Sequence, residues 1–327
     1  MNTTLKLSGF AAGLAAAFAA AFVAGASADP VAPDTDRPRG GMATPGHEAE
    51  GPGTDGHGTP GGHEDGSGSA ALPGLAVSDA GYTLDPAAAT LPRGRRVPFA
   101  FRITGPDGEA VTAYEEKHEK ELHLIVVRRD LAGFQHVHPT LAADGTWTVP
   151  LDVPSGGTYR VFADFEPTGL GRGVTLGTDL SVAGTFEPAP LPPPAATTSV
   201  DGFDVTVEGV GRVRAGQETE IAFTVSRGGR EVTDLQPYLG AFGHLVSLRT
   251  GDLAYLHTHP VEDAHDDAVE DAHGDADGDA DGDAHGGPTV RFATEFPTAG
   301  TYRLFLDFQV DGVVRTAELT ISAGKES

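Results

Sequence analysis

Two short segments of the chain carry histidines at a spacing that suits metal binding. Residues 133–139 read GFQHVHP and residues 254–260 read AYLHTHP, so each segment places two histidines either side of one residue and then ends with proline. Side chains at positions i and i+2 of a strand lie on the same face, about 7 Å apart, so two such imidazoles can hold one ion. The proline then ends the strand, which places the pair at a sheet edge.

Each segment belongs to a larger set of residues that occurs once in each half of the chain. His123 precedes His136 by 13 positions, and His244 precedes His257 by the same 13 positions. The aspartate of FADF, residues 162–165, recurs in FLDF. A third imidazole and a carboxylate from neighbouring strands would complete a shell of three or four nitrogen and oxygen ligands. The predicted metal ligands are therefore His123, His136, His138 and Asp164 in the first half and His244, His257, His259 and Asp307 in the second.

The residues that the chain lacks narrow the choice of metal. There is no cysteine, which excludes a blue-copper centre and thiolate sites. The two methionines, Met1 and Met42, lie in the N-terminal segments, so a thioether site for Cu(I) is not expected. If the leader is cleaved before Asp29, the mature chain does not begin with histidine. Imidazole and carboxylate ligands then leave Cu(II) or Zn(II) as the expected cofactor.

The same residues also allow a purely structural interpretation. His123 and His244 share a strand face with apolar neighbours, and the His-x-His-Pro segments could hydrogen-bond a turn of a duplicated fold. In this alternative the chain is a non-catalytic interaction or scaffold module of the cell envelope, without metal. Phe162 and Phe305 would then form an exposed pair that binds a partner protein.

Short apolar runs separated by Gly, Pro and Asp must position these side chains. Strands are expected at 97–103, 122–128, 146–151, 158–165 and 174–182, and a second series follows residue 198. GGTYRVFADF in the first series matches AGTYRLFLDF in the second, so the chain contains two copies of one unit. Tyr159 and Tyr302 have the position of the tyrosine corner of immunoglobulin domains. The predicted fold is all-β, with two tandem immunoglobulin-like β-sandwiches.

The rest of the chain divides around these two units. Residues 1–28 have the lysine, apolar run and small-residue ending of a secretory signal peptide. Gly, Pro, Asp and His dominate a tether at 29–73 and an acidic insertion at 261–287, which predicts that both are disordered and bind metal weakly. The predicted domains are an immunoglobulin-like domain at 74–186, a Pro-rich linker at 187–197 and a second immunoglobulin-like domain at 198–325.

Two further sequence features offer weaker signals. His118 lies in the charged connector EEKHEKELH and its counterpart in the second copy is Leu239, so we interpret it as a solvated residue. The run DADGDADGDA in the insertion is similar to the start of an EF-hand loop. Counted from Asp277, however, its twelfth position is Pro288 rather than the glutamate that calcium requires, which argues against a calcium site.

Charge and motif content limit the classes of function. The formal net charge of −25 argues against nucleic acid or an anionic membrane as a partner and favours cations. No nucleophile elbow or phosphate-binding loop is present, so we do not expect an enzyme. The signal peptide predicts a secreted or extracytoplasmic protein; an uncleaved N-terminal membrane anchor is the alternative. The expected partners are a metal ion and a protein of the cell envelope.

The combination of export signal, His-rich leader, small sandwiches and His-x-His segments resembles the CopC- and YtkA-type extracytoplasmic copper-handling proteins. It is also similar to secreted proteins of high-GC bacteria that carry duplicated His-x-His-Pro blocks such as HLIVVRRDLAGFQHVHP. The resemblance covers roughly residues 75–325 and implies metal binding in the cell envelope. The chain departs from the CopC type because it lacks Met-rich ligands and a mature N-terminal histidine. The residues that would carry the binding are His123, His136, His138, His244, His257 and His259.

Overall fold

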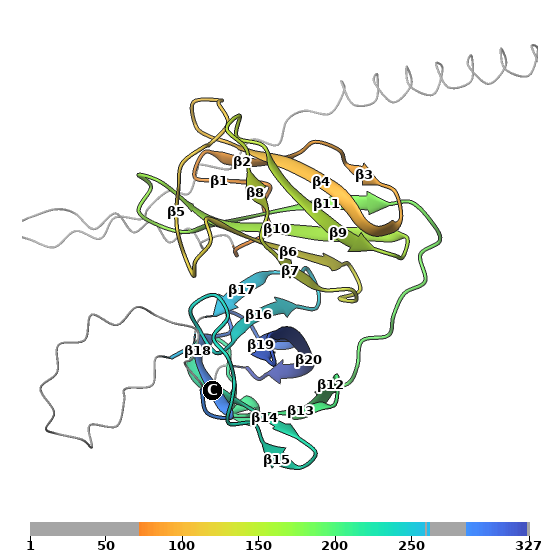
Figure 1. The fold of residues 1–327 in the computed structure, drawn as a ribbon, viewed down its shortest axis with the longest axis vertical. Helices are drawn as coiled ribbons and strands as arrows, with labels where there is room; N and C mark the ends of the chain where they lie inside the picture. Colours follow the sequence, from red (N-terminus) through yellow and green to blue (C-terminus); the bar gives the residue numbers. More distant parts are fainter. Residues whose placement is uncertain (1–71, 259, 262–285, 326–327) are drawn as a thin grey trace, which may run out of the picture. The chain divides into compact units, whose positions relative to one another are not determined.

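The computed structural model describes residues 72–258, 260–261 and 286–325, and these residues form two β-sandwiches (Figure 1). The prediction of two tandem immunoglobulin-like β-sandwiches is thereby confirmed. The predicted signal peptide, nearly all of the predicted tether and most of the acidic insertion lie outside the described residues. Within the described residues the charged connector that contains His118 forms a turn with a β-bridge between Lys117 and Lys120.

The first sandwich consists of two antiparallel sheets joined by short loops. One sheet has the order β1 (Ser78–Asp79), β2 (Tyr82–Pro86), β4 (Gly94–Thr104), β9 (Trp147–Val153) and β8 (Thr140–Leu141). The other has the order β3 (Thr90–Leu91), β11 (Val174–Val182), β10 (Gly157–Pro167), β6 (Leu122–Arg128) and β7 (Gln135–Val137), with β5 (Tyr114–Glu115) paired to β10. The parallel pairing of β3 with β11 is the exception to the antiparallel pattern.

The second sandwich repeats this arrangement. One sheet has the order β12 (Thr197–Val200), β13 (Phe203–Glu208), β14 (Glu218–Arg227) and β15 (Arg230–Glu231), with β18 (Thr289–Glu295) paired to β14. The other has the order β17 (Tyr255–Thr258), β16 (His244–Arg249), β19 (Gly300–Val310) and β20 (Val313–Ala323). A 3-10 turn, η1 (Val210–Arg212), follows β13.

Alternation of apolar and polar side chains explains why these segments form half-buried strands. In β9 every second residue of WTVPLDV is buried and the residues between are exposed, as a strand with one face on a core requires. The same pattern occurs in β13 and β18. Each sandwich therefore has its own core, in which Trp147 and Phe99 are prominent in the first and Phe223 and Phe292 in the second.

The tyrosine corners have the expected geometry. The Tyr159 hydroxyl donates a hydrogen bond to the Ser155 carbonyl at 3.0 Å, and the Tyr302 hydroxyl donates to the Thr298 carbonyl at 2.8 Å. In both sandwiches the acceptor lies four residues before the tyrosine. The equal geometry supports the duplication inferred from the sequence, and it anchors the central strands β10 and β19 on which Asp164 and Asp307 lie.

The strands that carry the predicted ligands are buried on both faces, unlike β9. All seven residues of β6 are buried, and in β19 the described pattern is buried from Tyr302 to Phe308. One face of β6 contributes Leu124 and Val126 to the first core, whereas His123 and the residues that alternate with it lie on the opposite face. The second face of β6 must therefore be covered by residues outside the core of the first sandwich.

A third apolar cluster joins the two sandwiches through these second faces. Phe134 stacks on Phe305 of the other sandwich with ring centroids 4.0 Å apart, and Phe162 stacks on Tyr255 at 5.2 Å. Phe162 and Phe305 are fully buried, so the prediction that they form an exposed partner-binding pair is wrong: each packs against the other sandwich. The buried members of the cluster are Ile125, Val127, Leu131, Phe162, Val246, Leu248, Leu253, Tyr255 and Phe305.

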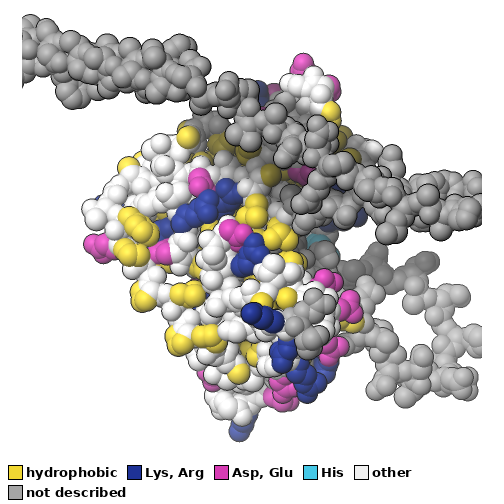
Figure 2. All heavy atoms as spheres, turned by 180° about the vertical axis from the view of Figure 1, so that it is seen from behind, with side chains coloured by type: hydrophobic (Ala, Val, Ile, Leu, Met, Phe, Trp, Pro, Cys, Tyr) yellow, Lys and Arg dark blue, Asp and Glu magenta, His cyan; other side chains and the backbone are white. Residues whose placement is uncertain are grey.

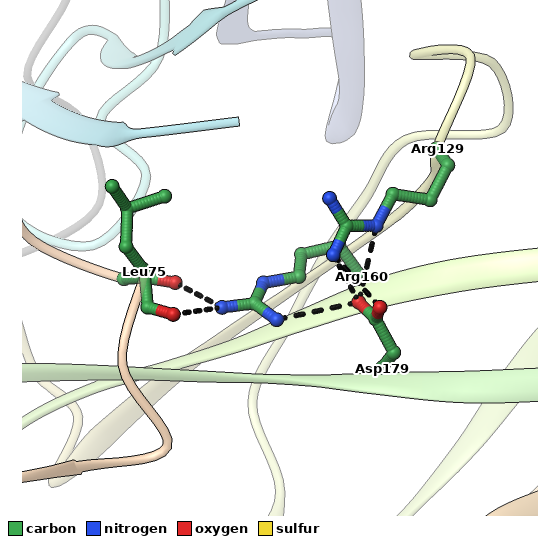
Figure 3. A network of polar contacts seen from close by, with 5 residues as sticks. Leu75, Arg129, Arg160 and Asp179 are labelled. Carbon is green, nitrogen blue, oxygen red and sulfur yellow. Dashed lines mark hydrogen bonds and ion pairs between the residues drawn. The ribbon is translucent and has the colours of Figure 1, made fainter. Parts of the chain in front are cut away.

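The segment that precedes β1 is bonded to both sandwiches. The Tyr255 amide donates to the Pro73 carbonyl at 3.1 Å, and the Arg160 guanidinium donates to the carbonyls of Gly74 and Leu75 at 2.6 and 2.9 Å. Figure 3 shows Arg160 extending between these carbonyls and the carboxylate of Asp179. The segment thus holds the edge of the interface between the sandwiches.

The surface offers no large apolar area on the face that Figure 2 displays. Hydrophobic side chains are scattered there among polar ones, and basic and acidic groups are interspersed. The large apolar side chains that are most exposed include Phe186 and Val313, which lie far apart in the sequence. Isolated apolar residues of this kind are normal on a protein surface. None of the helical turns in the described part of the chain has the length and hydropathy needed to span a bilayer.

Candidate metal site

His123 is fixed by a hydrogen bond from its outer ring nitrogen. It lies on β6 directly opposite Asp164 of β10, and it is 3% exposed. Its Nε2 lies 3.0 Å from the carbonyl oxygen of Lys117. A carbonyl oxygen only accepts, so Nε2 carries the hydrogen and, in the neutral ring, Nδ1 carries the lone pair. The turn before β6 therefore sets both the tautomer and the direction of this imidazole.

His136 is fixed in the same manner by the other sandwich. Its Nδ1 lies 2.8 Å from Oδ2 of Asp307, and both side chains are almost completely buried. The carboxylate accepts the Nδ1 hydrogen, which leaves the lone pair of the neutral ring on Nε2. Asp307 is held in turn by the hydroxyl of Thr316, which donates to Oδ1 at 2.6 Å. This chain of contacts joins β7 of the first sandwich to β19 and β20 of the second.

The lone pairs of His123 and His136 point at each other, and the ring of His138 lies beside them. His123 Nδ1 lies 3.0 Å from His136 Nε2, and His138 Nε2 lies 3.2 Å from His123 Nδ1. One candidate ligand atom from each of these three residues lies within 4.8 Å of the others. Two nitrogens bonded at 2.0–2.1 Å to one tetrahedral ion lie about 3.3 Å apart. The histidine triad, His123, His136 and His138, therefore has nearly the spacing of a metal-bound set.

Electrostatics favour the neutral form of His138. Burial, the neighbouring rings of His136 and His123, and the charge of Lys120 together lower the pKa of His138 to about 2, and burial has the largest effect. A histidine must be neutral to bind a metal ion, so this environment maintains the binding form at all ordinary pH values. The unfolded chain has no such environment and protonates the same residue near pH 6.5.

This difference predicts how the stability of the metal-free protein depends on pH. Between pH 6.5 and about 2 the unfolded chain binds a proton at His138 that the folded chain does not bind, so stability rises with pH and falls as pH is lowered below 6.5. A fully buried group would cost about 1.4 kcal/mol per pH unit. His138 is partly exposed, so we expect ~1 kcal/mol between pH 6.5 and 5.

Urea denaturation in the presence of a chelator, at pH 6.5 and 5, tests this prediction. In the His138→Leu variant the decrease in unfolding free energy between the two pH values should be smaller by that amount. An equal decrease in both proteins would show that His138 titrates normally in the folded state.

The second set of predicted ligands lies beside the triad, as far as it is described. His244 is fully buried on β16, opposite Asp307 of β19, and its Nε2 donates to the Tyr238 carbonyl at 2.7 Å. Its ring centroid lies 6.3 Å from that of His136. His244 therefore repeats the arrangement of His123, whose acceptor also lies six residues earlier.

The remaining members of the second set are only partly described. His257 lies on β17 opposite Val246, at the position that His136 occupies on β7 opposite Ile125. The side chain of His257 and the whole of His259 lie outside the described residues. Asp164, the carboxylate predicted for the first set, accepts hydrogen bonds from the hydroxyls of Tyr255 and Thr175, at 3.2 and 3.1 Å.

The structure differs from the sequence prediction at two points. We expected each half of the chain to build its own site, but the carboxylate bonded to the triad is Asp307, from the opposite sandwich. His118, interpreted as solvated, is half-buried, and its ring centroid lies 6.2 Å from that of His123 and 5.5 Å from that of His244. No sequence pattern marked His118, because its counterpart in the second copy is Leu239.

Comparison with known proteins identifies a family. A family model described as "Domain of unknown function (DUF8832)" matches the chain twice, over residues 76–181 and 198–325. No curated protein matches the chain at a significant level.

Several solved structures resemble the fold at low similarity. The Escherichia coli adhesin FdeC is 14% identical, with 76% of this chain and 66% of that chain covered and a TM-score of 0.23. Salmonella alpha-2-macroglobulin reacted with methylamine is 13% identical, with 77% and 15% covered and a TM-score of 0.24. Yersinia pseudotuberculosis InvD is 13% identical, with 76% and 59% covered and a TM-score of 0.22. This chain thus spans less than two thirds of each of these three structures, and likenesses with such TM-scores carry no argument about function.

Proposed function

We propose that this chain, which belongs to the DUF8832 family, is an exported protein that binds Cu(II) at the histidine triad, with Zn(II) as the second candidate. The observation that carries the proposal is the pair of acceptors at the outer ring nitrogens of His123 and His136, from which the positions of the ring hydrogens follow. His123 gives its N–H to a carbonyl and His136 gives its N–H to a carboxylate, so both turn a lone pair toward one point. Metal-binding histidines in proteins are held in this manner by an outer shell of acceptors.

Repulsion between the lone pairs also favours a bound cation. Two acceptor nitrogens 3.0 Å apart in a buried site repel each other unless a proton or a cation lies between them. A single proton on His138 can bridge to His123. One metal ion satisfies all three nitrogens at once. The low pKa of His138 is a further reason why a proton is the poorer occupant.

The ligand set supports Cu(II) or Zn(II) over harder ions. Three imidazoles suit Cu(II), Zn(II) and Ni(II), whereas Ca(II) and Mg(II) prefer oxygen ligands. For one set of nitrogen and oxygen ligands Cu(II) binds more tightly than Zn(II). In the proposed role the protein is a binding protein of the cell envelope, reached through its signal peptide, and it has no catalytic function. Weak sites in the His-rich tether and insertion would supplement the triad.

The alternative function, a metal-free scaffold module with structural histidines, loses one expected feature. It placed Phe162 and Phe305 in an exposed partner-binding pair, and both are buried between the sandwiches. In this alternative the triad would be held together by shared protons. A measurement of metal binding distinguishes the metal-binding protein from the metal-free scaffold module.

Equilibrium dialysis of the full-length protein against Cu(II) and Zn(II) tests the proposal. Wild-type protein should show one tight equivalent above a background of weak sites. His138→Ala should weaken the tight site by more than about 100-fold, since loss of an outer-shell partner alone costs 10–100-fold. His138 is only partly buried, so this variant should fold, which circular dichroism would verify.

The matched control removes a histidine from the tether. His57→Ala deletes the same side chain at a position outside the sandwiches, and it should keep the tight equivalent. If His138→Ala also keeps it, the triad does not hold the ion and the scaffold alternative stands.

A further inference from the structure

A pocket of about 580 Å³ opens beside the triad, at the junction of the two sandwiches. His123 lines this pocket, as do Lys120 and Glu121 of the first sandwich and Tyr255 and Leu256 of the second. His123 of the triad therefore borders a space that is large enough to admit a hydrated or chelated ion.

His118 lines the same pocket and lies next to His123. Their ring centroids are 6.2 Å apart and their planes are inclined by 67°. The ring of His118 is half-buried, whereas His123 is 3% exposed. A half-buried histidine that lines the pocket beside a buried ligand can contact an ion before the buried ligand does.

The backbone at His118 is unusual and is the same in both copies. His118 has a φ of 48° and its counterpart Leu239 has a φ of 54°, both in the left-handed region that residues other than glycine rarely adopt. In both copies the carbonyl just before this residue, that of Lys117 or Tyr238, accepts a hydrogen bond from the ring of His123 or His244. The two copies thus share the turn, and only the first places an imidazole on it.

We infer that His118 is the entry ligand of the metal site: it takes a divalent ion from the pocket and passes it to the triad. This inference rests on the proposed function. In the transfer His118 bonds the incoming ion through a ring nitrogen, and water or the ligands of a chelate are replaced one at a time by triad nitrogens. His118 then releases the ion. Each bond to the ion that breaks is replaced by a bond to a triad nitrogen, and the oxidation state of the metal does not change.

The charges around the pocket fit this route. Asp164, Glu121 and Glu166 line it and attract cations, while Lys117 lies 3.2 Å from Glu166 and offsets part of that charge. Direct entry past His123 without an intermediate ligand would require a buried site to bind a fully hydrated ion. A half-buried imidazole that lines the pocket lowers that barrier by replacing water stepwise.

The His118→Leu variant tests the inference with a residue that the fold already accepts. Leu239 shows that leucine fits this turn at the same φ, so the variant should fold. An entry ligand affects loading and release equally, so the dissociation constant for Zn(II) should change little. Both the rate of loading from a Zn(II)–nitrilotriacetate complex and the rate of release to pyridylazoresorcinol should fall about tenfold, which corresponds to about 1.4 kcal/mol in the barrier.

The control is Lys120→Ala, which removes another pocket side chain but no imidazole; its two rates should not fall. Unchanged rates in His118→Leu would overturn the inference. So would a large loss of equilibrium affinity, because His118 would then be a permanent ligand. Either result leaves a tight site that depends on His138, so failure of the inference is distinct from failure of the proposed function, in which wild-type protein has no tight site.

Discussion

Replacing Asp307 by asparagine should weaken binding of Cu(II) and Zn(II) at the triad by about 10–100-fold, although Asp307 belongs to the other sandwich. Its carboxylate accepts the Nδ1 hydrogen of His136 at 2.8 Å. The negative charge makes the imidazole a better donor to the ion and fixes its ring orientation. Asparagine keeps the size of the side chain and one acceptor oxygen, but it removes the charge.

The reason for the size of this effect is the burial of the pair. His136 and Asp307 are both almost completely buried, so water does not screen the charge of the carboxylate from the ring. Thr316 holds the carboxylate from the other side, and Thr316→Val should give a smaller loss of affinity in the same direction. Titration of each variant with Zn(II) against a competing chelator measures the change.

Asp311→Asn is the matched control for Asp307→Asn. It makes the same change of charge four residues later, at an exposed turn where asparagine tolerates the positive φ of 55°. Its affinity should equal that of the wild type. If both variants lose affinity equally, the effect comes from net charge rather than from the bond to His136.

Replacing Phe305 by alanine should destabilise the protein by about 3–5 kcal/mol and also weaken metal binding. Phe305 is fully buried and stacks on Phe134 with ring centroids 4.0 Å apart. The substitution leaves a cavity between the sandwiches instead of one inside a sandwich core. Asp307 lies two residues later on the same face of β19, so a looser interface displaces the carboxylate from His136.

Phe308→Ala separates loss of stability from loss of the site. Phe308 lies on the same strand but belongs to the core of the second sandwich, and it is also fully buried. Urea denaturation should show a similar loss of stability for both variants, whereas the affinity for Zn(II) in folded protein should fall only for Phe305→Ala. An unchanged affinity in Phe305→Ala would mean that the interface does not support the site.

Much of the fold could be predicted because its signals are local. The run LHLIVVR predicted a strand at 122–128, which is the extent of β6. The two GTY segments predicted the tyrosine corners, since the hydroxyl bonds a carbonyl only four residues away. The duplication then gave both sandwiches the same fold. These features depend on neighbours in the chain or within one sheet.

The features that were missed depend on contacts between the sandwiches. Strand periodicity places Phe162 and Phe305 on a second face but does not say what covers that face. A signal was present: LHLIVVR is apolar at consecutive positions, which indicates burial on both faces, whereas a strand with one free face alternates. The same reasoning would have suggested that His123 faces another domain, and hence that a carboxylate from that domain could reach the site.

His118 was missed for a different reason. Comparison of the two sequence copies draws attention to residues that recur, and His118 is aligned with Leu239. The duplicated turn keeps its φ and its carbonyl contact while one side chain differs. A difference between copies at a conformationally restricted position can therefore mark function as well as a match can.

X-ray absorption of the full-length protein loaded with one equivalent of Zn(II) tests the central claim most directly, because it counts the ligands. We predict three imidazole nitrogens at about 2.0–2.1 Å from the ion, and two or fewer in His138→Ala. A shell dominated by oxygen, or an identical spectrum in a variant that lacks His123, His136 and His138, would contradict the account.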